Sequence, residues 1–377
     1  MKILFTNFHR DWYGQPLTVL LIARELAARG HAVTLACPAG SALARRGREV
    51  GLPVLDSVRF RKTRHKLDTL RDVRLLGRFL RDEGYDLVHS HGSQDTWSVA
   101  LARRLYRLPA RQVMTRCNSK RIRTHAANRW LYRDSLDHLV LSSRALERGY
   151  ESFLRSGVLP PEKVQVIPHA YDTEEFCGDP QRHRVRRELG LNGEPLVGLV
   201  GRIDRYKGHR VLLSALGEVL QRHGETRILF VGSGSEEAPL RLEVERRGLD
   251  RRVHFLGFRE DVPRITGALD VSVLPSLGVD SSPTVLKEAL ALGVPVVAAD
   301  TGGIREVVDH GETGFIVPSG DSGALAGALL LLLNDRALAR RMGSLGPERM
   351  RERFSPRHCA DAHEALYERL LDQPSWK

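Results

Sequence analysis

Short apolar runs alternate with longer amphipathic segments from one end of the chain to the other. Residues 2–7 form the first such run, and a loop at 8–15 separates it from a helix that we expect to begin at Pro16. An apolar stripe with helical spacing marks its buried face, formed by Val19, Ile22, Ala23 and Leu26. Gly30 is expected to end the helix before a strand at 31–36.

The same alternation predicts strands in both halves of the chain. In the first half we expect them at Leu87–Ser90, 112–115, 139–141 and 164–167. In the second half we expect them near 196–200, 227–231, 253–256, 271–274, 294–298 and 314–317, each followed by a helix, with a final helix at 357–371. Strands that alternate with helices indicate an α/β fold with parallel sheets. Residues 168–195 are polar and broken by Pro and Gly, so we expect the connection between two domains there.

Length and composition fit this organisation. A chain of 377 residues is too long for one hydrophobic core and suits two α/β domains. The longest run of apolar residues and glycines, 324–333, is far shorter than the roughly 20 residues that span a bilayer. The N-terminus begins directly as a strand, without the apolar core of a secretory signal. Four scattered cysteines without a Cys-x-x-Cys pair lead us to expect free thiols in the cytoplasm.

The positive charge is concentrated in one segment. Residues 57–133 hold 16 Arg and 3 Lys against 5 Asp and 1 Glu, a net charge of +13 in a chain whose total is +12. Such a segment favours nucleic acid, an anionic membrane surface or a phosphorylated substrate, although part of it can be a solvated helix face. Nucleic acid is disfavoured because the segment lacks interleaved aromatic platforms and any recognisable binding module.

Two segments of the second half carry candidate chemistry where a strand gives way to a helix. Arg202 and Lys207 follow the run 196–200, whereas Asp280 and Glu288 follow the run 271–274. Fixed cations that face a helix N-terminus can hold a diphosphate, and nearby carboxylates can accept hydrogen bonds from sugar hydroxyls. The combination suits a nucleotide-sugar site. Each half alone has a plainer explanation, namely a solvated loop or a solvated helix face.

The order of motifs in the second half resembles the retaining family-4 glycosyltransferases, which have the GT-B fold. The resemblance is strong over 196–320 and looser before that, and it is carried by Gly232, Gly234, Pro275, Ser276, Glu288, Gly302, Gly303, Thr313 and Gly314. It implies two Rossmann-like, doubly wound domains that face each other across a cleft. Residues 1–168, joined by a C-terminal helix at 355–377, would bind the acceptor, and 169–354 would bind the nucleotide-sugar donor.

The resemblance also implies roles for individual residues. Arg202 and Lys207 correspond to the pair that binds the diphosphate, Asp280 to the acid that contacts the donor sugar, and Glu288 to the acid that binds ribose. Phe258 and Arg259 stand where the base is held, with a surface loop as the alternative. The remaining donor-binding candidates are Gly14, Gln15, Gly201, Arg116, Cys117, Asn118, Ser282, Pro283, Thr284 and Val285. Among these, Pro283 is expected to fit the first helical turn and the N–H groups of Thr284 and Val285 to face the phosphates.

Three positions depart from the pattern of the family. Gly14 stands alone, followed by Gln15, where the family has two glycines, and a plain loop glycine is the alternative. Asp280 is one methylene shorter than the usual Glu, which puts its reach to the sugar in doubt. Cys117 aligns with a His that contacts the donor sugar, so the donor differs, Arg116 or Asn118 replaces that contact, or the alignment is slipped.

The acceptor side is defined less sharply. His89 and His91 end a strand and are expected to line the cleft, and basic residues around 59–66 and 120–133, among them Arg121, Arg123 and Arg129, are expected to face an anionic partner. No third ligand accompanies the two histidines and no Asp-x-Asp pair occurs, so we expect neither a metal nor another cofactor.

We therefore expect a retaining, metal-independent glycosyltransferase that uses a UDP- or GDP-linked sugar. The expected acceptor is an anionic or lipid-linked glycan of cell-envelope polysaccharide or lipopolysaccharide synthesis. The enzyme would lie in the cytoplasm, bound peripherally to the inner face of the membrane. A nucleotide-sugar 2-epimerase and a catalytically inactive scaffold with the same fold remain as alternatives.

Overall fold

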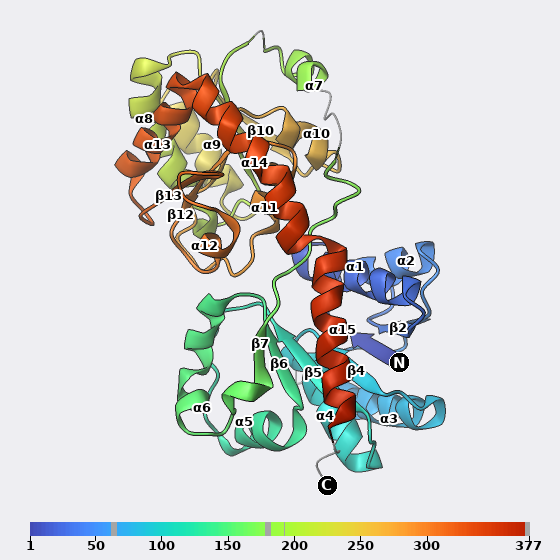
Figure 1. Cartoon of the computed structure of the whole chain (residues 1–377). Helices are drawn as coiled ribbons and strands as arrows, with labels where there is room; N and C mark the ends of the chain where they lie inside the picture. The colour runs from blue at the N-terminus through green and yellow to red at the C-terminus, as the bar shows by residue number, and fades with distance from the viewer. Residues whose placement is uncertain (62–65, 178–181, 192, 374–377) are drawn as a thin grey trace. The chain divides into compact units, whose positions relative to one another are not determined.

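The computed structural model describes residues 1–61, 66–177, 182–191 and 193–373. The chain divides into two compact units (Figure 1): a first unit, Met1–Tyr171 together with the chain from Phe354 onward, and a second unit, Asp172–Arg353. Each contains one parallel sheet with helices, which confirms the predicted α/β class with two Rossmann-like sheets. The sequence-based division at 168/169 and 354/355 lies within three residues of these limits.

The sheet of the first unit has seven strands in the order β3-β2-β1-β4-β5-β6-β7. Their bounds are β1 Lys2–Thr6, β2 Ala32–Ala36, β3 Val54–Leu55, β4 Leu87–Ser90, β5 Arg111–Arg116, β6 His138–Leu141 and β7 Val164–Val166. The α-helices are α1 Gly14–Ala28, α2 Ala42–Glu49, α3 Lys66–Glu83, α4 Ser93–Tyr106, α5 Ala126–Trp130, α6 Glu151–Arg155 and α15 Pro356–Asp372. A short π-helix, Leu131–Ser135, and two 3₁₀ segments, Arg144–Tyr150 and Pro161–Lys163, complete the described elements of this unit.

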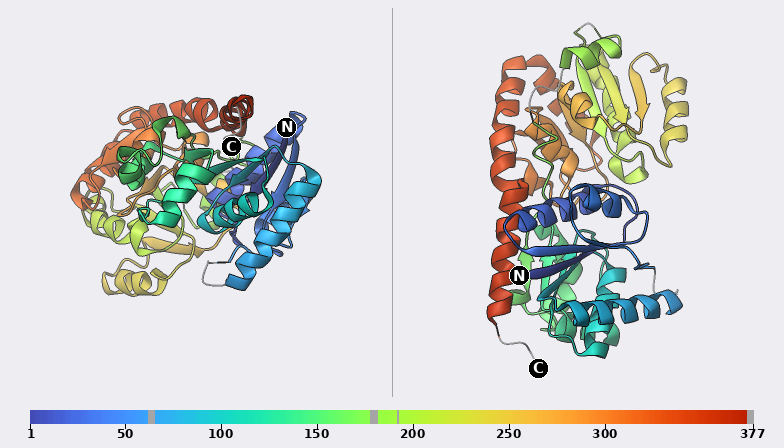
Figure 2. Two further views of the ribbon diagram at one scale, coloured as in Figure 1. Left: turned by 90° about the horizontal axis from the view of Figure 1, so that it is seen from below. Right: turned by 90° about the vertical axis from the view of Figure 1, so that its right-hand side faces the viewer.

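Alternate residues of β1 point to opposite faces of the sheet and belong to two separate hydrophobic cores. Helices cover both faces (Figure 2). Ile3 and Phe5 pack with apolar residues of α1 and α15, whereas Leu4 packs with those of α3 and α4. The helix α15 lies beside α1 although it comes last in the sequence, and Glu364 binds both Arg29 and His31 there.

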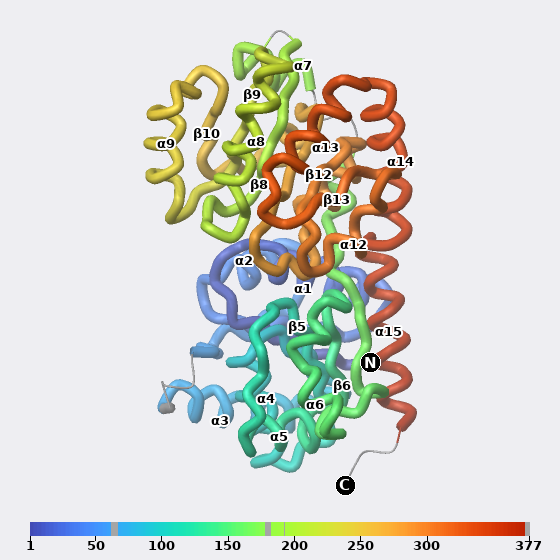
Figure 3. The backbone as a smooth tube through the Cα atoms, turned by 90° about the vertical axis from the view of Figure 1, so that its left-hand side faces the viewer, coloured from blue at the N-terminus to red at the C-terminus, as the bar shows by residue number. Residues whose placement is uncertain are grey.

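The sheet of the second unit has six parallel strands in the order β10-β9-β8-β11-β12-β13. Their bounds are β8 Leu196–Val200, β9 Arg227–Val231, β10 Val253–Gly257, β11 Val271–Leu274, β12 Val296–Ala299 and β13 Gly314–Val317. The helices are α7 Arg182–Glu188, α8 His209–Arg222, α9 Glu237–Arg246, α10 Val262–Gly267, α11 Thr284–Ala291, α12 Ile304–Val307, α13 Ser322–Asn334 and α14 Arg336–Phe354. On one face α13 packs beside α8 (Figure 3), and leucines from both helices fill the core against β8 and β9.

Among the elements that differ from the sequence-based expectation are α1, β3 and α7. The helix α1 begins at Gly14 rather than Pro16, and its N-cap is Tyr13, whose side chain makes no capping hydrogen bond. The two-residue strand β3 was not anticipated. The expected connection at 168–195 contains the helix α7, which is held in place because Arg182 and Arg186 both pair with Asp270 at the start of β11.

Candidate active site

The strand order of the second unit reverses between β8 and β11. Open α/β sheets bind ligands outside the carboxyl ends of their strands at such a reversal. Gly201 and Arg202 follow β8 directly, and Pro275 and Ser276 follow β11. The two loops are joined by a hydrogen bond of 2.7 Å from Leu277 N to the carbonyl oxygen of Tyr206. The two predicted segments therefore meet at the place where this fold binds ligands.

Lys207 and Asp280 form an ion pair at this edge. The Lys207 ammonium lies 2.6 Å from Oδ1 of Asp280, and the two side chains are 21% and 18% exposed. The other carboxylate oxygen of Asp280 accepts a hydrogen bond from the Ser276 hydroxyl. Both oxygens of Asp280 are thus engaged within the protein, and this carboxylate orients Lys207.

Arg202 is the exposed cation of the site, with 83% of its side chain accessible and Asp204 3.3 Å away. Asp204 also accepts the backbone N–H groups of Tyr206 and Lys207, which fixes the 3₁₀ turn Arg205–Lys207. One cation is therefore held by its surroundings while the other reaches into solvent.

Two glycines allow the loops to approach each other. Gly208 has φ +75°, and a Cβ there would collide with the carbonyl oxygen of Pro275. Gly302 has φ +57°, and a Cβ there would collide with the backbone of Asp280. Its neighbour Gly303 donates a hydrogen bond of 2.8 Å to the carbonyl oxygen of Asp280. Larger residues at these positions would move Lys207 or Asp280.

Glu288 lies in α11 and is only 9% exposed. Burial raises its pKa to about 8, and the nearby carboxylates of Glu175 and Asp172 act in the same direction while Lys287 lowers it. The carboxyl group is therefore largely protonated at neutral pH in the unliganded site, and it can donate as well as accept a hydrogen bond.

The helix α11 begins at Thr284, and Pro283 is its N-cap rather than a residue of the first turn, which corrects the expectation for that residue. Thr284 and Val285 are the first two helical residues, where backbone N–H groups lack partners inside the helix and favour an anion. Ser282 accepts a hydrogen bond of 2.7 Å from the Lys287 ammonium.

The two residues expected near the base lie on the surface after β10. Phe258 is 74% exposed. Arg259 makes two bonds of 2.7 Å to the carboxylate of Asp261. No contact joins either residue to Arg202 or Lys207 in the described structure, so their role stays a prediction.

In the first unit the strand order reverses between β1 and β4, and Gly14 and Gln15 open the helix after β1. Gln15 is buried, and its side-chain amide donates a hydrogen bond to the carbonyl of His91 at the end of β4. This bond holds the Gln15 side chain against the residue that follows β4, and the expected contact with the donor stays a prediction. Gly14 is the first residue of α1 rather than a loop residue, and its role toward the donor stays a prediction.

The two histidines expected to line a cleft are buried instead. His89 has no exposed surface, and its ring nitrogens bond with the Tyr367 hydroxyl at 2.5 Å and the Thr115 hydroxyl at 2.8 Å. His91 is 5% exposed and its Nδ1 lies 3.1 Å from the carbonyl oxygen of Thr6. Helix α15 covers His89 with Tyr367, so His89 is not placed to contact an acceptor, whereas the role of His91 stays a prediction.

The strand β5 extends one residue further than expected and ends with Arg116, which is 5% exposed. Its guanidinium donates to the Ser93 hydroxyl at 3.1 Å and to the Lys120 carbonyl at 3.3 Å. Cys117 follows, half-buried, and burial raises the pKa of its thiol to about 11, so it is uncharged at neutral pH. Asn118 is exposed.

A hollow of about 250 Å³ lies at this end of β5. It collects cationic and ionisable side chains without an Asp or Glu among them: Arg116, Lys120, Arg121, Arg123 and His125. Arg129, also expected on this side, is exposed but does not line the hollow. The arrangement is suited to an anionic group.

Comparison with known proteins gives the family. The model described as "Glycosyltransferase Family 4" matches residues 12–175, and the one described as "Glycosyl transferases group 1" matches residues 181–349. A D-inositol 3-phosphate glycosyltransferase of Corynebacterium jeikeium is 32% identical over 321 residues, which cover 78% of this chain and 74% of the relative. This chain is a family-4 glycosyltransferase. A phosphatidyl-myo-inositol mannosyltransferase of Mycobacterium leprae is 36% identical to the enzyme over 192 residues, 49% of this chain and 48% of that protein.

Solved structures confirm the GT-B fold of this glycosyltransferase. HepE of Anabaena in complex with UDP has a TM-score of 0.83 at 23% identity, covering 98% of this chain and 100% of HepE. A glycosyltransferase of Rickettsia africae has a TM-score of 0.87 at 17% identity, covering 99% of each chain.

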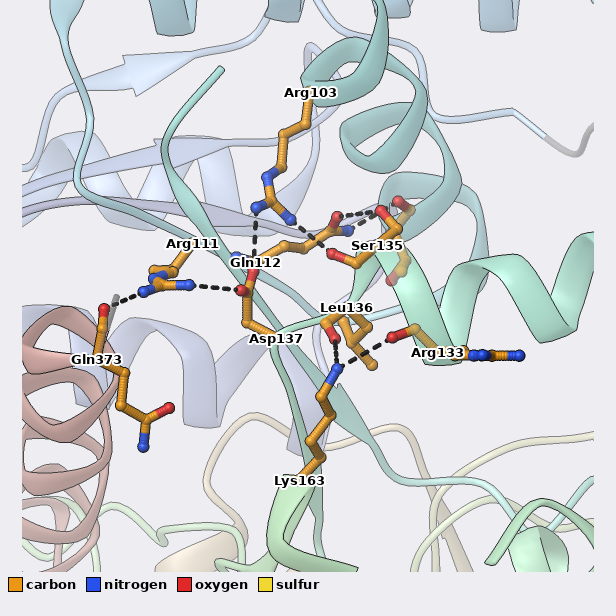
Figure 4. A network of polar contacts seen from close by, with 10 residues as sticks. Arg103, Arg111, Gln112, Arg133, Ser135, Leu136, Asp137, Lys163 and Gln373 are labelled. Carbon is orange, nitrogen blue, oxygen red and sulfur yellow. Dashed lines mark hydrogen bonds and ion pairs between the residues drawn. The ribbon is translucent and has the colours of Figure 1, made fainter. Parts of the chain in front are cut away.

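Part of the enzyme's basic segment is neutralised internally. Arg103 and Arg111 both pair with Asp137, at 3.0 and 3.1 Å, and Lys163 donates to two backbone carbonyls beside them (Figure 4). Arg59 and Arg61 share Asp68 in the same way. Residues 62–65 of the expected basic stretch 59–66 lie outside the described residues.

Sequence reasoning missed three buried ionisable residues of the glycosyltransferase. Asp95, at the start of α4, accepts hydrogen bonds from the Thr6 hydroxyl and from His91 N, and burial raises its pKa to about 7. His209, the first residue of α8, is 2% exposed and its ring nitrogens have no hydrogen-bond partner. Lys287 has no exposed surface. Their position beside strand–helix junctions is the only signal that the sequence offers for them.

The described residues contain neither a cluster of metal ligands nor a single helix that could span a membrane. No three His, Cys, Asp or Glu side chains among them come together as a metal site would require. No single described helix is long and apolar enough to cross a membrane. The segments Ser322–Asn334 and Arg336–Asp372 together have the length and composition of a membrane span, but they are bent by 98° at their junction.

Proposed function

We propose that this family-4 glycosyltransferase moves a sugar from a nucleoside-diphosphate sugar to a phosphorylated or lipid-linked glycan acceptor. The observation that carries the proposal is the Lys207–Asp280 ion pair at the reversal between β8 and β11, next to the exposed Arg202. Two cations and the N–H groups at the start of α11 would stabilise a leaving diphosphate, which gains negative charge.

The donor is proposed to be UDP-linked, with GDP as the other candidate. HepE of Anabaena, which shares the fold, has been solved with UDP. Glu288 supports a ribose contact because its buried carboxyl group can both donate to and accept from a hydroxyl pair. Asp280 supports catalysis through Lys207 rather than by its own reach to the sugar.

The proposed reaction retains the anomeric configuration and uses no metal ion. The bond between the anomeric carbon and the diphosphate oxygen breaks, the acceptor oxygen bonds to that carbon, and the acceptor proton passes to the leaving phosphate. Arg202 and Lys207 stabilise the departing charge, and the protein otherwise positions the two substrates. Both carboxylate oxygens of Asp280 are bonded within the protein, to Lys207 and to Ser276, which supports a route without an enzymatic nucleophile.

The acceptor is proposed to carry a phosphate group and to belong to cell-envelope polysaccharide or lipopolysaccharide synthesis. The hollow lined by Arg116, Lys120, Arg121 and Arg123, with no acid in its lining, supports an anionic acceptor. The names of two relatives point the same way, since one is an inositol 3-phosphate glycosyltransferase and the other a phosphatidylinositol mannosyltransferase. An acceptor of this kind would bring the enzyme to the inner face of the membrane.

The test is transfer from a panel of UDP- and GDP-sugars to a phosphorylated acceptor, such as an inositol phosphate, and to its dephosphorylated form. We expect transfer to the phosphorylated acceptor only, with the product retaining the donor's anomeric configuration by NMR. Equal transfer to both acceptors would contradict the phosphate proposal. Conversion of the nucleotide sugar to its C2 epimer would favour an epimerase instead, and nucleotide binding without turnover would favour an inactive scaffold.

A further inference from the structure

Lys287 is an unusual lysine, because it has no exposed surface and is among the largest fully buried side chains of the enzyme. Lysine side chains are almost never fully buried, because removal of an ammonium from water is costly. The sequence motif does not include this residue, since it stands between the helix start at Thr284 and the acid Glu288.

The side chain of Lys287 runs back toward the N-terminus of α11, as helical side chains do. Its ammonium reaches Ser282 Oγ at 2.7 Å, beyond the N-cap Pro283. A positive charge therefore stands inside the protein at the helix end that already carries the positive pole of the helix dipole. The Lys287 ammonium adds to the positive potential that favours an anion at this helix end.

Ser282 belongs to the loop that carries Asp280. Elsewhere this loop is held by the hydrogen bond from Gly303 N to Asp280 O and by the bond from Ser319 Oγ to Ser276 O at 3.0 Å. The Lys287–Ser282 bond joins the end of this loop to α11. All three ties lie within the second unit, and they add to the Leu277–Tyr206 and Asp280–Lys207 bonds that join this loop to the Arg202–Lys207 loop.

We propose that Lys287 is a positioning residue of the donor site: it holds the loop 276–283 through Ser282 and places a buried positive charge behind the helix start that binds the donor diphosphate. This inference rests on the proposed nucleotide-sugar site and names a part of it that the motif does not contain. Its charge also acts on Glu288, whose pKa it lowers while Glu175 and Asp172 raise it.

The test compares binding of UDP by calorimetry, from pH 6 to pH 9, in the wild-type enzyme and in Lys287→Met and Ser282→Ala. Loss of a charged hydrogen bond predicts that Lys287→Met raises the Kd about tenfold or more, and that Ser282→Ala raises it less. With the preferred donor, KM should rise while kcat changes little. The pH at which UDP binding changes should move upward in Lys287→Met, because Glu288 loses a neighbouring cation. Arg222→Met removes an exposed charge at the end of α8 and should change none of these values.

A purely structural lysine predicts a different result. Replacing a buried charge by an apolar side chain of similar shape is often neutral or stabilising, so Lys287→Met would keep or raise the melting temperature without changing the Kd for UDP. An unchanged Kd and pH profile in both variants, in an enzyme whose wild type binds UDP, would overturn this inference alone. If Lys287→Met does not fold, an unchanged Ser282→Ala overturns it. A wild type that binds neither UDP nor GDP would overturn the donor site itself and this inference with it.

Discussion

Asp280 shows how one methylene changes the role of a side chain. The carboxylate is one methylene shorter than the usual Glu, and it contacts Lys207, which lies 73 positions earlier in the sequence, and the Ser276 hydroxyl. We infer that Asp280 acts by holding the Lys207 ammonium in place for the diphosphate. This role differs from the sugar contact that the resemblance implies.

Asp280→Asn should therefore weaken the site through Lys207. An amide loses the charge that orients the ammonium, and we expect kcat/KM for the donor to fall about tenfold or more, the scale for one charged hydrogen bond. Steady-state kinetics measure the change, with Glu218→Gln on the exposed face of α8 as the control. If Asp280→Asn is as active as the control, Asp280 does not orient Lys207.

Strands with a continuous apolar sequence could be predicted, because a short apolar run bounded by Gly or Pro is typical of a buried parallel strand. The strands β8, β9, β11 and β13 have the predicted bounds. The positions of other elements and side chains depend on partners that lie far away in the sequence. The helix α7 is anchored by Asp270, 84 residues beyond Arg186, and His89 is buried by Tyr367, 278 residues further along the chain. Local sequence carries no signal for either contact. In the candidate site, the sequence predicted that Arg202, Lys207, Asp280 and Glu288 lie where a strand gives way to a helix. It did not predict the ion pair between Lys207 and Asp280 or the burial of Glu288.

The start of α11 yields a prediction about metals. Phosphate charge would be balanced by helix N–H groups and by Arg202 and Lys207, so activity should survive an excess of EDTA. Turnover of the preferred donor is measured before and after chelation, with and without added Mg²⁺ or Mn²⁺. Activity that is lost on chelation and restored only by a divalent ion would show that these groups do not balance the phosphate charge without a metal.

The packing of α15 on the first sheet makes the stability of the first unit sensitive to acid. His363 is buried and hydrogen-bonded to the Cys359 carbonyl, with His89 and Tyr367 beside it, and burial lowers its pKa to about 4. The unfolded chain binds a proton near pH 6.5, so stability is complete above that pH and falls as the pH drops toward 4. One such group accounts for a loss of about 2 kcal/mol between pH 7 and pH 5.

His363→Phe should reduce this dependence, because it removes one group that titrates only in the unfolded chain. Urea unfolding at pH 7 and pH 5 can be followed by tryptophan fluorescence, which reports on the first unit because residues 172–353 contain no Trp. An equal loss of stability in the variant and the wild type would assign the acid sensitivity to other groups, such as His91, whose pKa burial lowers to about 3.

For the whole molecule, the net charge of +12 overstates what is free to bind a partner. Asp137 and Asp68 each neutralise arginines of the basic segment, whereas the hollow with Arg121 and Arg123 has no acid in its lining. Binding to an anionic surface should therefore depend on a few arginines near the end of β5 rather than on total charge.

Co-sedimentation with vesicles tests the proposed membrane binding. The bound fraction should rise with anionic lipid and fall with salt, because each Lys or Arg near the surface contributes about 1 kcal/mol within a Debye length of roughly 8 Å. It should also fall when Arg121, Arg123 and Arg129 are changed to Ser. The matched control changes three exposed arginines of the second unit, Arg222, Arg246 and Arg251. Equal loss in both triple variants, or no binding by the wild type, would contradict peripheral attachment through this side of the first unit.

The most direct test of the central claim is the rate at which the enzyme releases nucleoside diphosphate from its preferred nucleotide sugar in Arg202→Ala and Lys207→Ala. Each should fall by about 10²-fold or more, the scale for losing one donor to a developing anion. Circular dichroism and the melting temperature should stay close to those of the wild type, because both residues lie on a loop beyond β8. Near-normal release in both variants would contradict a diphosphate site at the β8–β11 reversal.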